Sequence, residues 1–427
     1  MVQKTKILII GNGFGGVYTL KNLHKFLKRD KNINLSMIGD KNYFLFTPLL
    51  HEVATGGINP INIIESIRKI LGGYLDDFYL GKAEQINLKE KTVSINETIV
   101  SYDYLVIAPG SQTNFFDTPG AERYTFTLKS IDDAIKIKNH CITQMEKASH
   151  IKDSAERKNM LRFVIVGGGP TGVELVAEME ELVRETFSRY YDKEIVKDVS
   201  IVLIQRGPDL VPQFGSKIRN KSLKVLKSKG INVMLNSAVK EVGASYVVVN
   251  DDIKINTQTV IWVAGIKPIT LKFIGEVEQS PDGKLSVNEY LQLKNYQEVF
   301  AIGDAASFND STNNTFLPAL GQVAEKEARM VAKNINLMMS GNALEKFSYH
   351  SSGNLMSLGR WMAVGEIANF SFSGHIAWWF WRTVYLSKLI SFRKKVRVAI
   401  DWTINVFSPR DISRTVSILR PIDISRL

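Results

Sequence analysis

The sequence predicts an α/β protein built from two Rossmann-like dinucleotide-binding units, the second inserted in the first, followed by an amphipathic helical segment. Three observations carry this prediction: a glycine-rich turn after a buried strand near the N-terminus, a second copy about 156 residues later, and an aromatic, basic stretch near the C-terminus. The length of 427 residues allows two or three domains. A hydrophobic content of 44% with 23% charged residues is typical of globular proteins.

The composition also limits the chemistry. Cys141 is the only cysteine, so no intramolecular disulfide can form, and we expect a small buried thiol. The histidines are scattered without the spacing of metal ligands, so the sequence predicts no metal site. Only four consecutive apolar residues, Ile7 to Ile10, precede the first glycine, which favours a strand over a secretory signal. The sequence has no uncharged apolar run of roughly 18 residues, the length that a membrane-spanning helix needs.

The net charge of +11 is unevenly distributed along the chain. Residues 376–427 carry ten Lys and Arg against three Asp, a surplus of seven positive charges. Such a segment is typical of proteins that bind an anionic partner, which is either a nucleic acid or a membrane surface.

The first glycine turn has the pattern G-x-G-x-x-G between an apolar strand and a helix. Gly11 permits the tight turn, Gly13 lets a pyrophosphate approach the backbone, and Gly16 lets the helix pack on the strand. The phosphates would lie at the helix N-terminus, where free N–H groups and the helix dipole favour anions. Asp40 ends the next strand, where it could hold the hydroxyl pair of a ribose; a solvated loop aspartate is the alternative.

Between the two turns the apolar segment 44–57 is broken by Pro48 and by two glycines, so it is neither a strand nor a helix throughout. It could line a flat aromatic ring such as a flavin, or it could simply connect core elements. The other expected elements are a helix at 17–27, strands at 32–39, 78–87, 91–100 and 102–111, and helices at 60–72, 129–149 and 155–160.

The second glycine turn, within 161–178, repeats the first with Gly167, Gly169 and Gly172. One such motif is weak evidence, but two of them, each after a buried strand, predict two dinucleotides in one chain. In the following helix, Glu174 lies close to the third glycine and should point toward the cofactor. Most of the acids of this helix are expected to form a solvated face that complements the helix N-terminus, among them Glu178, Glu180 and Glu181.

The next strand, at 199–207, ends in Gln205 and Arg206, where an acid would be expected to hold the ribose of NAD. Gln205 can hydrogen-bond a hydroxyl without repelling phosphate, and Arg206 could bind a 2′-phosphate. The choice between NADH and NADPH therefore stays open. Further along we expect a helix at 215–229, strands at 231–236 and 245–255, a strand at 259–268 that breaks at Gly265, an extended segment at 285–295, a strand at 299–308 and a helix at 319–339.

The strand at 299–308 repeats the pattern of a strand that runs into glycine. Asp304 follows Gly303 at a helix start, where its charge suits the helix N-terminus and its oxygens can accept from a polyol hydroxyl. A plain N-cap is the alternative.

The stretch 375–407 holds four of the six tryptophans. On a helix, one face would carry Trp378, Trp381, Tyr385 and Leu389, and a second apolar stripe would carry Val396, Ile400, Ile404 and Phe407. Between them lie the cations Arg393, Lys394, Lys395 and Arg397. Aromatic rings with flanking cations are typical of a helix in a lipid interface. The alternatives are single-stranded nucleic acid, a dimer interface or a packed core; the stretch lacks an RNA-binding motif, so we expect no nucleic acid.

The chain has two predicted dinucleotide sites but neither a metal cluster nor a cysteine pair, and this limits the reactions that it could catalyse. If one site holds FAD and the other a nicotinamide cofactor, hydride transfer between the two rings needs no protein acid or base, because the protein only orients the rings and excludes water. The electrons would leave to oxygen, to a protein carrier or to a lipid-soluble acceptor, and the C-terminal stretch favours the last. A soluble NAD(P)H-dependent flavin oxidoreductase and a non-catalytic redox-sensing binding protein are the alternatives.

Several segments together resemble the type II NADH dehydrogenases, which are single-subunit NADH:quinone oxidoreductases of the FAD-dependent pyridine nucleotide-disulfide reductase-like superfamily. The resemblance covers nearly the full length, and HEVATG and the C-terminal stretch make it specific. The segments are GNGFGG (11–16), NYFLFTPLLHEVATG (42–56), YDYLVIAPGSQTNFF (102–116), VGGGPTGVELVAEM (166–179), IWVAGIKP (261–268), FAIGDAA (300–306) and LISFRKKVRVAIDW (389–402).

This resemblance implies FAD in 1–120 and 297–345, a nicotinamide cofactor in 121–296, and a membrane-association and dimerisation region at 346–427. It implies a quinone acceptor beside the helix that starts near 320, and a peripheral homodimer on the cytoplasmic face of the membrane. The cofactor-binding residues assigned in this way are Gly11, Gly13, Phe14, Gly15, Gly16, Asp40, Thr47, Pro48, Leu49, Ala108, Gly110, Gly167, Gly169, Pro170, Thr171, Gly172, Glu174, Gln205, Arg206, Ala264, Gly265, Gly303, Asp304, Gln322 and Val323. The candidate catalytic residues are Glu174, Gln322 and Lys326.

In two places the chain departs from that pattern. The family often has Ala-Gln-x-x-x-Gln beside the quinone, where this chain has Gly321, Gln322 and Lys326. It usually has an acid where this chain has Gln205. The departure at Gly321 and Lys326 affects the identity of the electron acceptor, and the one at Gln205 affects the choice between NADH and NADPH as donor.

Overall fold

The computed structural model describes residues 4–27, 30, 32–71, 75–310, 315–367 and 370–414, which group into two compact units. Unit 1 comprises Met1–Leu45, Ile64–Gln112 and Ile266–His350, and unit 2 comprises Phe46–Ile63, Thr113–Gly265 and Ser351–Leu427. Two segments of the second unit are thus inserted in the first, and its third segment, Ser351–Leu427, follows the first unit in the chain. The expected boundaries divide the chain differently, because they separate 346–427 as a region of its own, and its residues 415–427 lie outside the described ranges.

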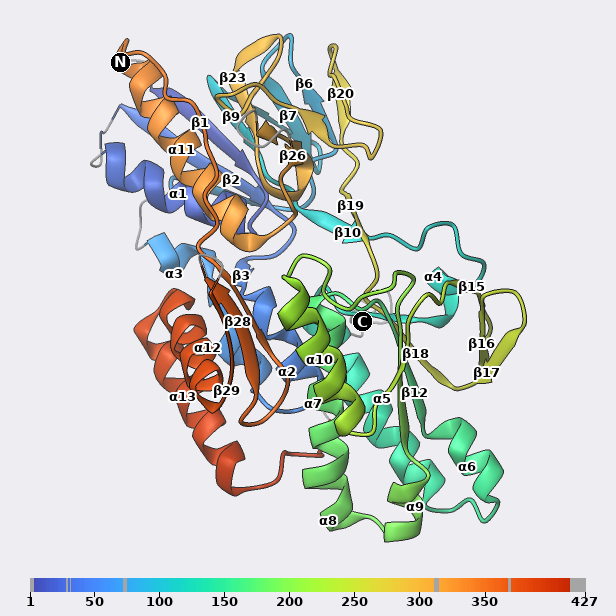
Figure 1. Ribbon diagram of the computed structural model, residues 1–427. Coiled ribbons are helices and arrows are strands. Elements are labelled where there is room, and N and C mark those ends of the chain that lie inside the picture. The colour runs from blue at the N-terminus through green and yellow to red at the C-terminus, as the bar shows by residue number, and fades with distance from the viewer. Residues whose placement is uncertain are drawn as a thin grey trace, which may run out of the picture. The chain divides into compact units, whose positions relative to one another are not determined.

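The core of unit 1 is a sheet in the order β22-β23-β9-β1-β2-β5. The strands are β1 (Thr5–Ile10), β2 (Ile33–Gly39), β5 (Asp77–Leu80), β9 (Tyr104–Ile107), β22 (Gln292–Leu293) and β23 (Tyr296–Ala301). All neighbours are parallel except β22, which is antiparallel to β23. The helices α1 (Phe14–Leu27) and α11 (Gly321–Met339) lie side by side in this unit (Figure 1).

Smaller elements complete unit 1. A second sheet consists of β6 (Gln85–Asn87), β7 (Thr92–Ile95), β8 (Thr98–Ser101) and β20 (Lys272–Ile274). Short strands are β3 (Tyr43–Leu45), β4 (Ile64–Ser66), β19 (Ile266–Pro268), β21 (Leu285–Ser286), β24 (Ala306–Ser307), β25 (Asn309–Asp310) and β26 (Thr315–Phe316), while β10 (Ser111–Thr113) ends just inside unit 2. The helix expected at 60–72 is wrong: a 3-10 turn at Pro60–Ile63 is followed by β4 and then by α3 (Ile67–Leu71), because β4 pairs with β3.

Unit 2 is built on a parallel sheet in the order β11-β18-β12-β13-β14. Its strands are β11 (Phe126–Thr127), β12 (Arg162–Val166), β13 (Ser200–Ile204), β14 (Asn232–Met234) and β18 (Thr259–Trp262). Because the strands are parallel, the turns after β12, β13 and β18 meet at one edge of the sheet, where ligands bind in folds of this kind. The predicted α/β class with two units of this type is confirmed.

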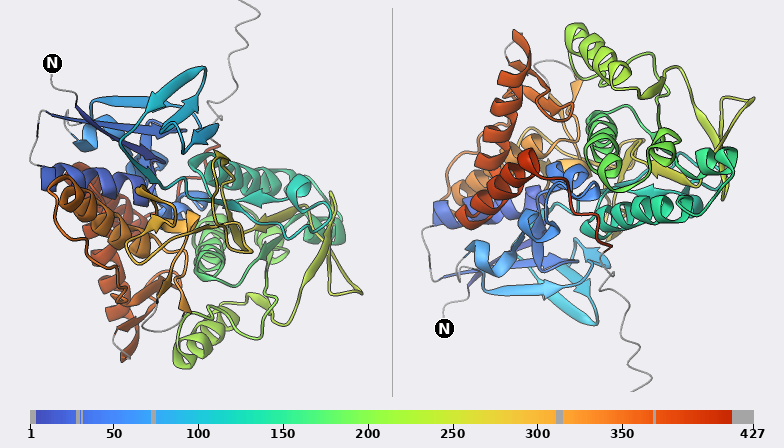
Figure 2. Two further views of the ribbon diagram at one scale, coloured as in Figure 1. Left: turned by 90° about the horizontal axis from the view of Figure 1, so that it is seen from above. Right: turned by 90° about the horizontal axis from the view of Figure 1, so that it is seen from below.

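Further sheets and helices surround this core. The antiparallel sheets are β15 (Val239–Val242), β16 (Tyr246–Val249) and β17 (Ile253–Asn256), and β27 (Asn354–Ser357), β28 (Ala363–Ile367) and β29 (Phe370–Gly374). The helices are α2 (Leu50–Ala54), α4 (Ala121–Tyr124), α5 (Ile131–Ala148), α6 (Ser154–Met160), α7 (Pro170–Glu181), α8 (Ser188–Tyr190), α9 (Lys193–Lys197), α10 (Ser216–Ser228), α12 (His375–Lys388) and α13 (Phe392–Phe407). The two C-terminal helices α12 and α13 lie next to each other (red, Figure 2).

Local sequence explains where the functional helix of unit 2 begins and how it is extended. Gly169 takes the N-cap position of α7 with φ −74°, and Pro170 occupies the first turn, where a missing N–H costs nothing. A π-helical stretch, Leu182–Phe187, continues α7 without a break. The helix therefore presents both its N-terminus and a long buried face to the rest of unit 2.

Candidate functional site

The first glycine turn forms an open cradle at the N-terminus of α1. Gly11 has φ +103°, and a Cβ there would lie 2.0 Å from the carbonyl oxygen of Ala108, so only glycine fits. A Cβ on Gly16 would lie 1.8 Å from the carbonyl oxygen of Gly11, which shows how closely helix and strand approach. Around Gly13, in contrast, a Cβ would meet no heavy atom within 4 Å. The cradle therefore leaves room where a pyrophosphate would approach, as the motif predicts.

The end of β2 is tied to this cradle by a side chain that the motif does not specify. Asn12 Nδ2 donates to the carbonyl oxygens of Lys41 and Tyr43, at 2.7 and 2.8 Å. Asp40 lies between the end of β2 and these carbonyls and is exposed. Since β1 and β2 are parallel, Asp40 and the glycine turn lie at the same edge of the sheet, so this carboxylate is available to a ribose bound there.

Asp304 lies in a cluster of polar side chains, with Ser111 and Glu327, beside the main sheet of unit 1. Its carboxylate accepts from Ser111 Oγ at 2.5 Å, and Gly303 before it has φ +67°. The Gly303 N–H donates to Glu327 Oε2 at 2.6 Å, and burial raises the pKa of Glu327 to about 7. The sequence interpretation missed Glu327, because it looked like one of many charged residues of α11.

The first turn of α11 lies beside the first glycine turn. A Cβ on Gly321 would lie 3.4 Å from the ring of Phe14. Val323 is buried and Gln322 is half-buried. Lys326 points elsewhere in unit 1: its ammonium donates to the carbonyl of His350 and lies 5.1 Å from the centroid of the Tyr349 ring. The structure thus brings Gln322 near the cradle and pairs Lys326 with the segment 349–350.

The second glycine turn repeats the geometry in unit 2. Gly167 has φ +117°, and a Cβ there would lie 2.8 Å from the backbone of Ala264. A Cβ on Gly172 would lie 1.9 Å from the carbonyl oxygen of Gly167, whereas one on Gly169 would meet nothing within 4 Å. Thr171, one residue into α7, is exposed. The positions of the structural glycines and of the open one match those of the first turn.

The residues after β13 and β18 complete this edge. Gln205 Oε1 accepts from the Gly168 N–H at 2.9 Å, and Arg206 is exposed with its guanidinium 5.7 Å from the centroid of the Phe116 ring. Trp262 Nε1 donates to the carbonyl of Ala264 at 2.9 Å, which orders the turn before Gly265. The structure therefore brings together all the residues of unit 2 that were expected to bind a nicotinamide cofactor, with the exception of Glu174.

Glu174 lies on the buried side of α7, in contact with His51. Glu174 Oε2 is 3.7 Å from His51 Nδ1, and Oε1 accepts from the Ser357 N–H at 3.1 Å. Burial raises the pKa of Glu174 well above its ordinary value, and burial lowers the pKa of His51 to about 4. Burial therefore favours the uncharged form of both groups, which weakens any ion pair between them.

The turn at Thr47–Leu49 leads directly to this pair. It is a 3-10 turn with Pro48 near its start, an exposed Thr47 and a buried Leu49, and it continues into α2, which carries His51 and Glu52. Its expected place beside a flavin ring stays a prediction.

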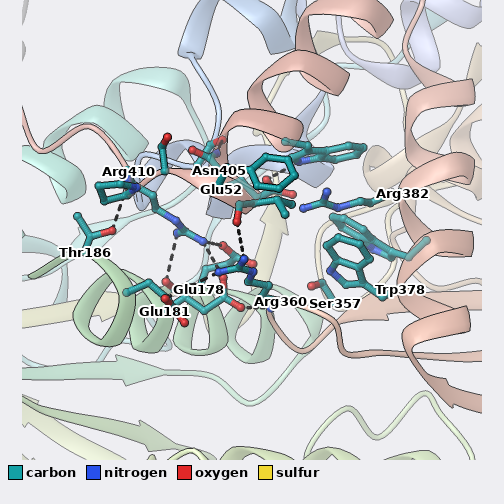
Figure 3. A pocket seen from close by; sticks show the side chains of 18 of the residues that line it. Glu52, Glu178, Glu181, Thr186, Ser357, Arg360, Trp378, Arg382, Asn405 and Arg410 are labelled. Carbon is teal, nitrogen blue, oxygen red and sulfur yellow. Dashed lines mark hydrogen bonds and ion pairs between the residues drawn. The ribbon is translucent and has the colours of Figure 1, made fainter. Parts of the chain in front are cut away.

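The acids of α7 form a buried cluster, so the expected solvated face is wrong. Glu178, Glu180 and Glu181 are 6%, 8% and 5% exposed. Arg410 reaches two of them from the C-terminal segment: its Nη2 is 2.5 Å from Glu178 Oε2 and 2.9 Å from Glu181 Oε2 (Figure 3). Glu180 instead bonds Lys229, at 3.0 Å. Helical spacing shows which residues share a face, but only a partner 232 positions away in sequence shows that this face is covered.

Protonation differs among the members of the cluster. Burial and the nearby Glu178 raise the pKa of Glu52 to about 8, and the same two causes raise that of Glu181 to about 8. For Glu178 burial acts in the same direction, but the guanidinium of Arg410 outweighs it, and the pKa is lowered. Arg410 therefore faces one ionised carboxylate and a second that carries its proton near neutral pH.

The cluster borders a cavity of about 50 Å³ in unit 2, which has room for water molecules. Its walls include Arg360, Arg382 and three tryptophans, Trp378, Trp381 and Trp402 (Figure 3). Trp402 Nε1 donates to Glu52 Oε2 at 2.6 Å, and the guanidinium of Arg382 lies 3.7 Å from the centroid of the Trp378 ring. The C-terminal helices thus supply much of the lining.

The aromatic face of the C-terminal stretch was expected to place its rings among the lipid headgroups, but the structure buries most of it. Trp378, Trp381 and Trp402 are only 2%, 1% and 3% exposed, because they pack in unit 2. On α13 the second predicted stripe is open: Val396, Ile400, Ile404 and Phe407 are 42%, 50%, 53% and 80% exposed. On α12 the exposed apolar residues are Ile376, Trp379 and Phe380.

Cys141 is free and buried, and burial raises its pKa to about 12, so the thiol does not ionise near neutral pH. Among the described residues, His, Cys, Asp and Glu form no group that could hold a metal ion. In the same residues, every helix is too short or too polar to cross a lipid bilayer.

Comparisons with known proteins give consistent matches. Residues 5–328 match the family described as pyridine nucleotide-disulphide oxidoreductase, and residues 351–411 match the NDH2 C-terminal domain. The chain is 31% identical to a probable NADH dehydrogenase of Dictyostelium discoideum, over 97% of this chain and 92% of that protein. It is 29% identical to a type II NADH:quinone oxidoreductase of Mycobacterium tuberculosis, over 97% of this chain and 91% of that protein.

Solved structures show the same likeness. NDH2 from Plasmodium falciparum in complex with NADH superposes with a TM-score of 0.89 at 25% identity, over 96% of this chain and 100% of that one. The sulfide:quinone oxidoreductase of Aquifex aeolicus has a TM-score of 0.74 at 20% identity, over 95% and 96% of the two chains, which shows a shared fold.

Proposed function

Since the chain belongs to the type II NADH dehydrogenases of the pyridine nucleotide-disulphide oxidoreductase family, we propose that it oxidises NADH and passes the electrons through FAD to a membrane quinone. The observation that carries this proposal is the pair of glycine cradles, each with an open central glycine, Gly13 and Gly169. The single buried cysteine supports it, because electrons cannot leave through a dithiol in this chain.

Unit 1 fits FAD. The open space at Gly13 suits a pyrophosphate, and Asp40 and Asp304 offer carboxylate oxygens to the ribose and polyol hydroxyls. When bound, FAD accepts a hydride from the nicotinamide and gives up two electrons to the next acceptor. The residues of the chain hold the cofactor at the helix N-terminus, and we assign this role to 1–120 and 297–345.

The donor site is assigned to 121–296 and uses the second cradle. Its positive helix end at Pro170 and Thr171 favours the pyrophosphate of NADH, and the Ala264-Gly265 turn closes the same edge of the sheet. In this proposal Glu174 does not touch the cofactor: its carboxyl accepts from the Ser357 N–H and so helps to hold α7 in place.

The acceptor is a quinone, which takes up two electrons and two protons, one of them from NADH and one from solvent, to form the quinol. We place its site beside the first turn of α11, at Gln322. Lys326, one helical turn further along α11, donates to the His350 carbonyl, and its role beside the quinone stays a prediction. The names of the relatives support the quinone as acceptor for this chain.

Anaerobic redox titration tests the proposal. The purified protein should carry tightly bound yellow flavin, NADH should bleach it, and a short-chain quinone should restore the colour. Reoxidation by oxygen as fast as by quinone would favour the soluble oxidoreductase instead. A colourless protein that binds no added FAD would contradict the proposal.

We further propose that the protein associates peripherally with the cytoplasmic face of the membrane, as a homodimer. The membrane association is supported by the exposed apolar stripe of α13 and by Arg393, which flanks it. Apolar side chains next to a positive charge suit a surface of anionic lipid.

Charges placed in this stripe test the membrane association. The double substitution Ile400→Glu and Ile404→Glu should reduce binding to anionic vesicles by about 10-fold or more. It removes apolar side chains that would be buried in the lipid, and the new carboxylates repel the anionic headgroups. Flotation with vesicles measures the bound fraction. Ile99→Glu, at a 73% exposed apolar position of unit 1, is the control and should bind normally. Normal binding of the double variant would exclude the α13 stripe as the membrane contact.

A further inference from the structure

The amide of Gln205 has a fixed orientation at the carboxyl edge of the unit 2 sheet. The backbone N–H of Gly168 can only donate, so the atom 2.9 Å from it must be the acceptor Oε1. With Oε1 used in this way, the amide directs Nε2 to the space beside the turn. Gln205 therefore offers donors where an ionised carboxylate would offer only acceptors.

This difference decides which nucleotide the edge tolerates. A carboxylate accepts from the 2′-hydroxyl of NADH and repels the 2′-phosphate of NADPH. An amide NH2 can donate to a hydroxyl oxygen and equally to a phosphate oxygen. Gln205 thus removes the usual barrier to NADPH without removing a hydrogen bond to NADH.

Arg206, next in the chain, supplies a positive charge at the same edge. Its guanidinium is exposed, lies over the ring of Phe116, and makes no ion pair within the part of the chain that the structure describes. The acid of the following loop, Asp209, is bound to Arg219 at 2.5 Å. No carboxylate is therefore seen to neutralise Arg206 among the described residues.

The platform under Arg206 is itself ordered. Phe116 packs so closely on Gly265 that a Cβ there would lie 2.3 Å from the ring, and the Asn114 N–H donates to the Gly265 carbonyl at 3.2 Å. The Asn114 carbonyl accepts from Trp262 Nε1 at 3.0 Å. The loop that carries Phe116 is thus tied to the end of β18, and Arg206, which follows β13, lies over the Phe116 ring. A planar guanidinium suits a phosphate there.

We propose that Gln205 and Arg206 are specificity-determining residues that let unit 2 take the 2′-phosphorylated nucleotide NADPH as well as NADH. This inference rests on the proposed function for the role of the donor. The binding of the nucleotide itself is separate from that role, because it needs only the second cradle and these two side chains.

The test compares two fragments that differ only in the 2′-phosphate. Calorimetric titration of the full-length flavoprotein with 2′,5′-ADP and with 5′-ADP gives the ratio of the two affinities. The wild type should bind 2′,5′-ADP at least as tightly as 5′-ADP. In Gln205→Glu the affinity ratio should shift against 2′,5′-ADP by about 100-fold, because the new carboxylate repels the 2′-phosphate. In Arg206→Gln it should shift by about 10-fold, because a charge-assisted contact is lost.

Arg123→Gln is the matched control, because Arg123 is another exposed arginine of unit 2 that lies over an aromatic ring, with its guanidinium 5.3 Å from the Tyr124 centroid. Its affinity ratio should equal that of the wild type. A wild type that binds 2′,5′-ADP more than about 10-fold more weakly than 5′-ADP, or a Gln205→Glu variant with an unchanged ratio, would overturn the inference.

Flavin bleaching separates this inference from the proposed function. Reduction of the wild type by both NADH and NADPH supports both. Reduction by NADH alone leaves the proposed function standing and overturns the inference. A protein that binds both ADP fragments but is reduced by neither donor contradicts the proposed function, while the affinity ratio still supports the inference.

Discussion

Replacing Arg410 by alanine should lower the free energy of unfolding by about 3–5 kcal/mol, which is the usual cost of leaving a buried charge without its partner. The Arg410 side chain is 10% exposed and bonds Glu178 and Glu181, which are themselves buried. Without the guanidinium, the ionised carboxylate of Glu178 must either stay uncompensated or take up a proton. Chemical unfolding of the holoprotein, followed by circular dichroism, measures the change.

Two further variants make this result specific. Arg414→Ala removes an exposed arginine four residues later and should change stability by less than about 0.5 kcal/mol. Glu178→Gln in the Arg410→Ala background should recover part of the loss, because the uncompensated charge is then removed. A loss below about 1 kcal/mol for Arg410→Ala would show that water enters the cavity and screens the cluster.

The same cluster changes how a C-terminal truncation is interpreted. Removing 375–427 deletes Arg382, Trp402 and Arg410, and with them a hydrogen bond to Glu52 and the counterion of Glu178. We therefore expect truncation to unfold unit 2, and point substitutions in the exposed α13 stripe are the cleaner test of membrane binding.

Alanine at the central glycine of each cradle should weaken binding at one nucleotide site and spare the other. Gly169→Ala should weaken NADH binding by about 10-fold to 100-fold, because the new methyl group stands where the pyrophosphate approaches. Gly13→Ala should lower the FAD content of the purified protein in the same way. A Cβ at either position would meet no heavy atom of another segment within 4 Å, so both variants should fold. Flavin absorbance and the KM for NADH measure the two effects.

The two variants serve as controls for each other. Gly169→Ala should keep its flavin and its melting temperature, and Gly13→Ala should keep its affinity for 5′-ADP. At Gly172 the outcome should differ, since a methyl group there would lie 1.9 Å from the Gly167 carbonyl and would destabilise the fold. An unchanged KM in Gly169→Ala would show that the second cradle does not hold the donor.

The sequence by itself determined the two glycine turns, their flanking strands and helices, and the residues at one edge of each sheet. These features are local: a turn that needs φ above zero at Gly11 or Gly167, and a close approach that only glycine allows, leave their mark within a few positions. Parallel pairing of the following strands then brings Asp40, Gln205 and Asp304 to the expected edges.

Only the tertiary structure decided which polar and aromatic faces are buried. The acids of α7 have the helical spacing of a solvated face, and Trp378 and Trp381 of α12 have the spacing of a lipid-facing one. All of them are instead buried: Arg410, which follows α13, reaches the carboxylates of α7, and the two tryptophans pack in unit 2. Burial depends on what covers a face, and the covering segment here lies more than two hundred residues away in the chain, where no local pattern can reveal it.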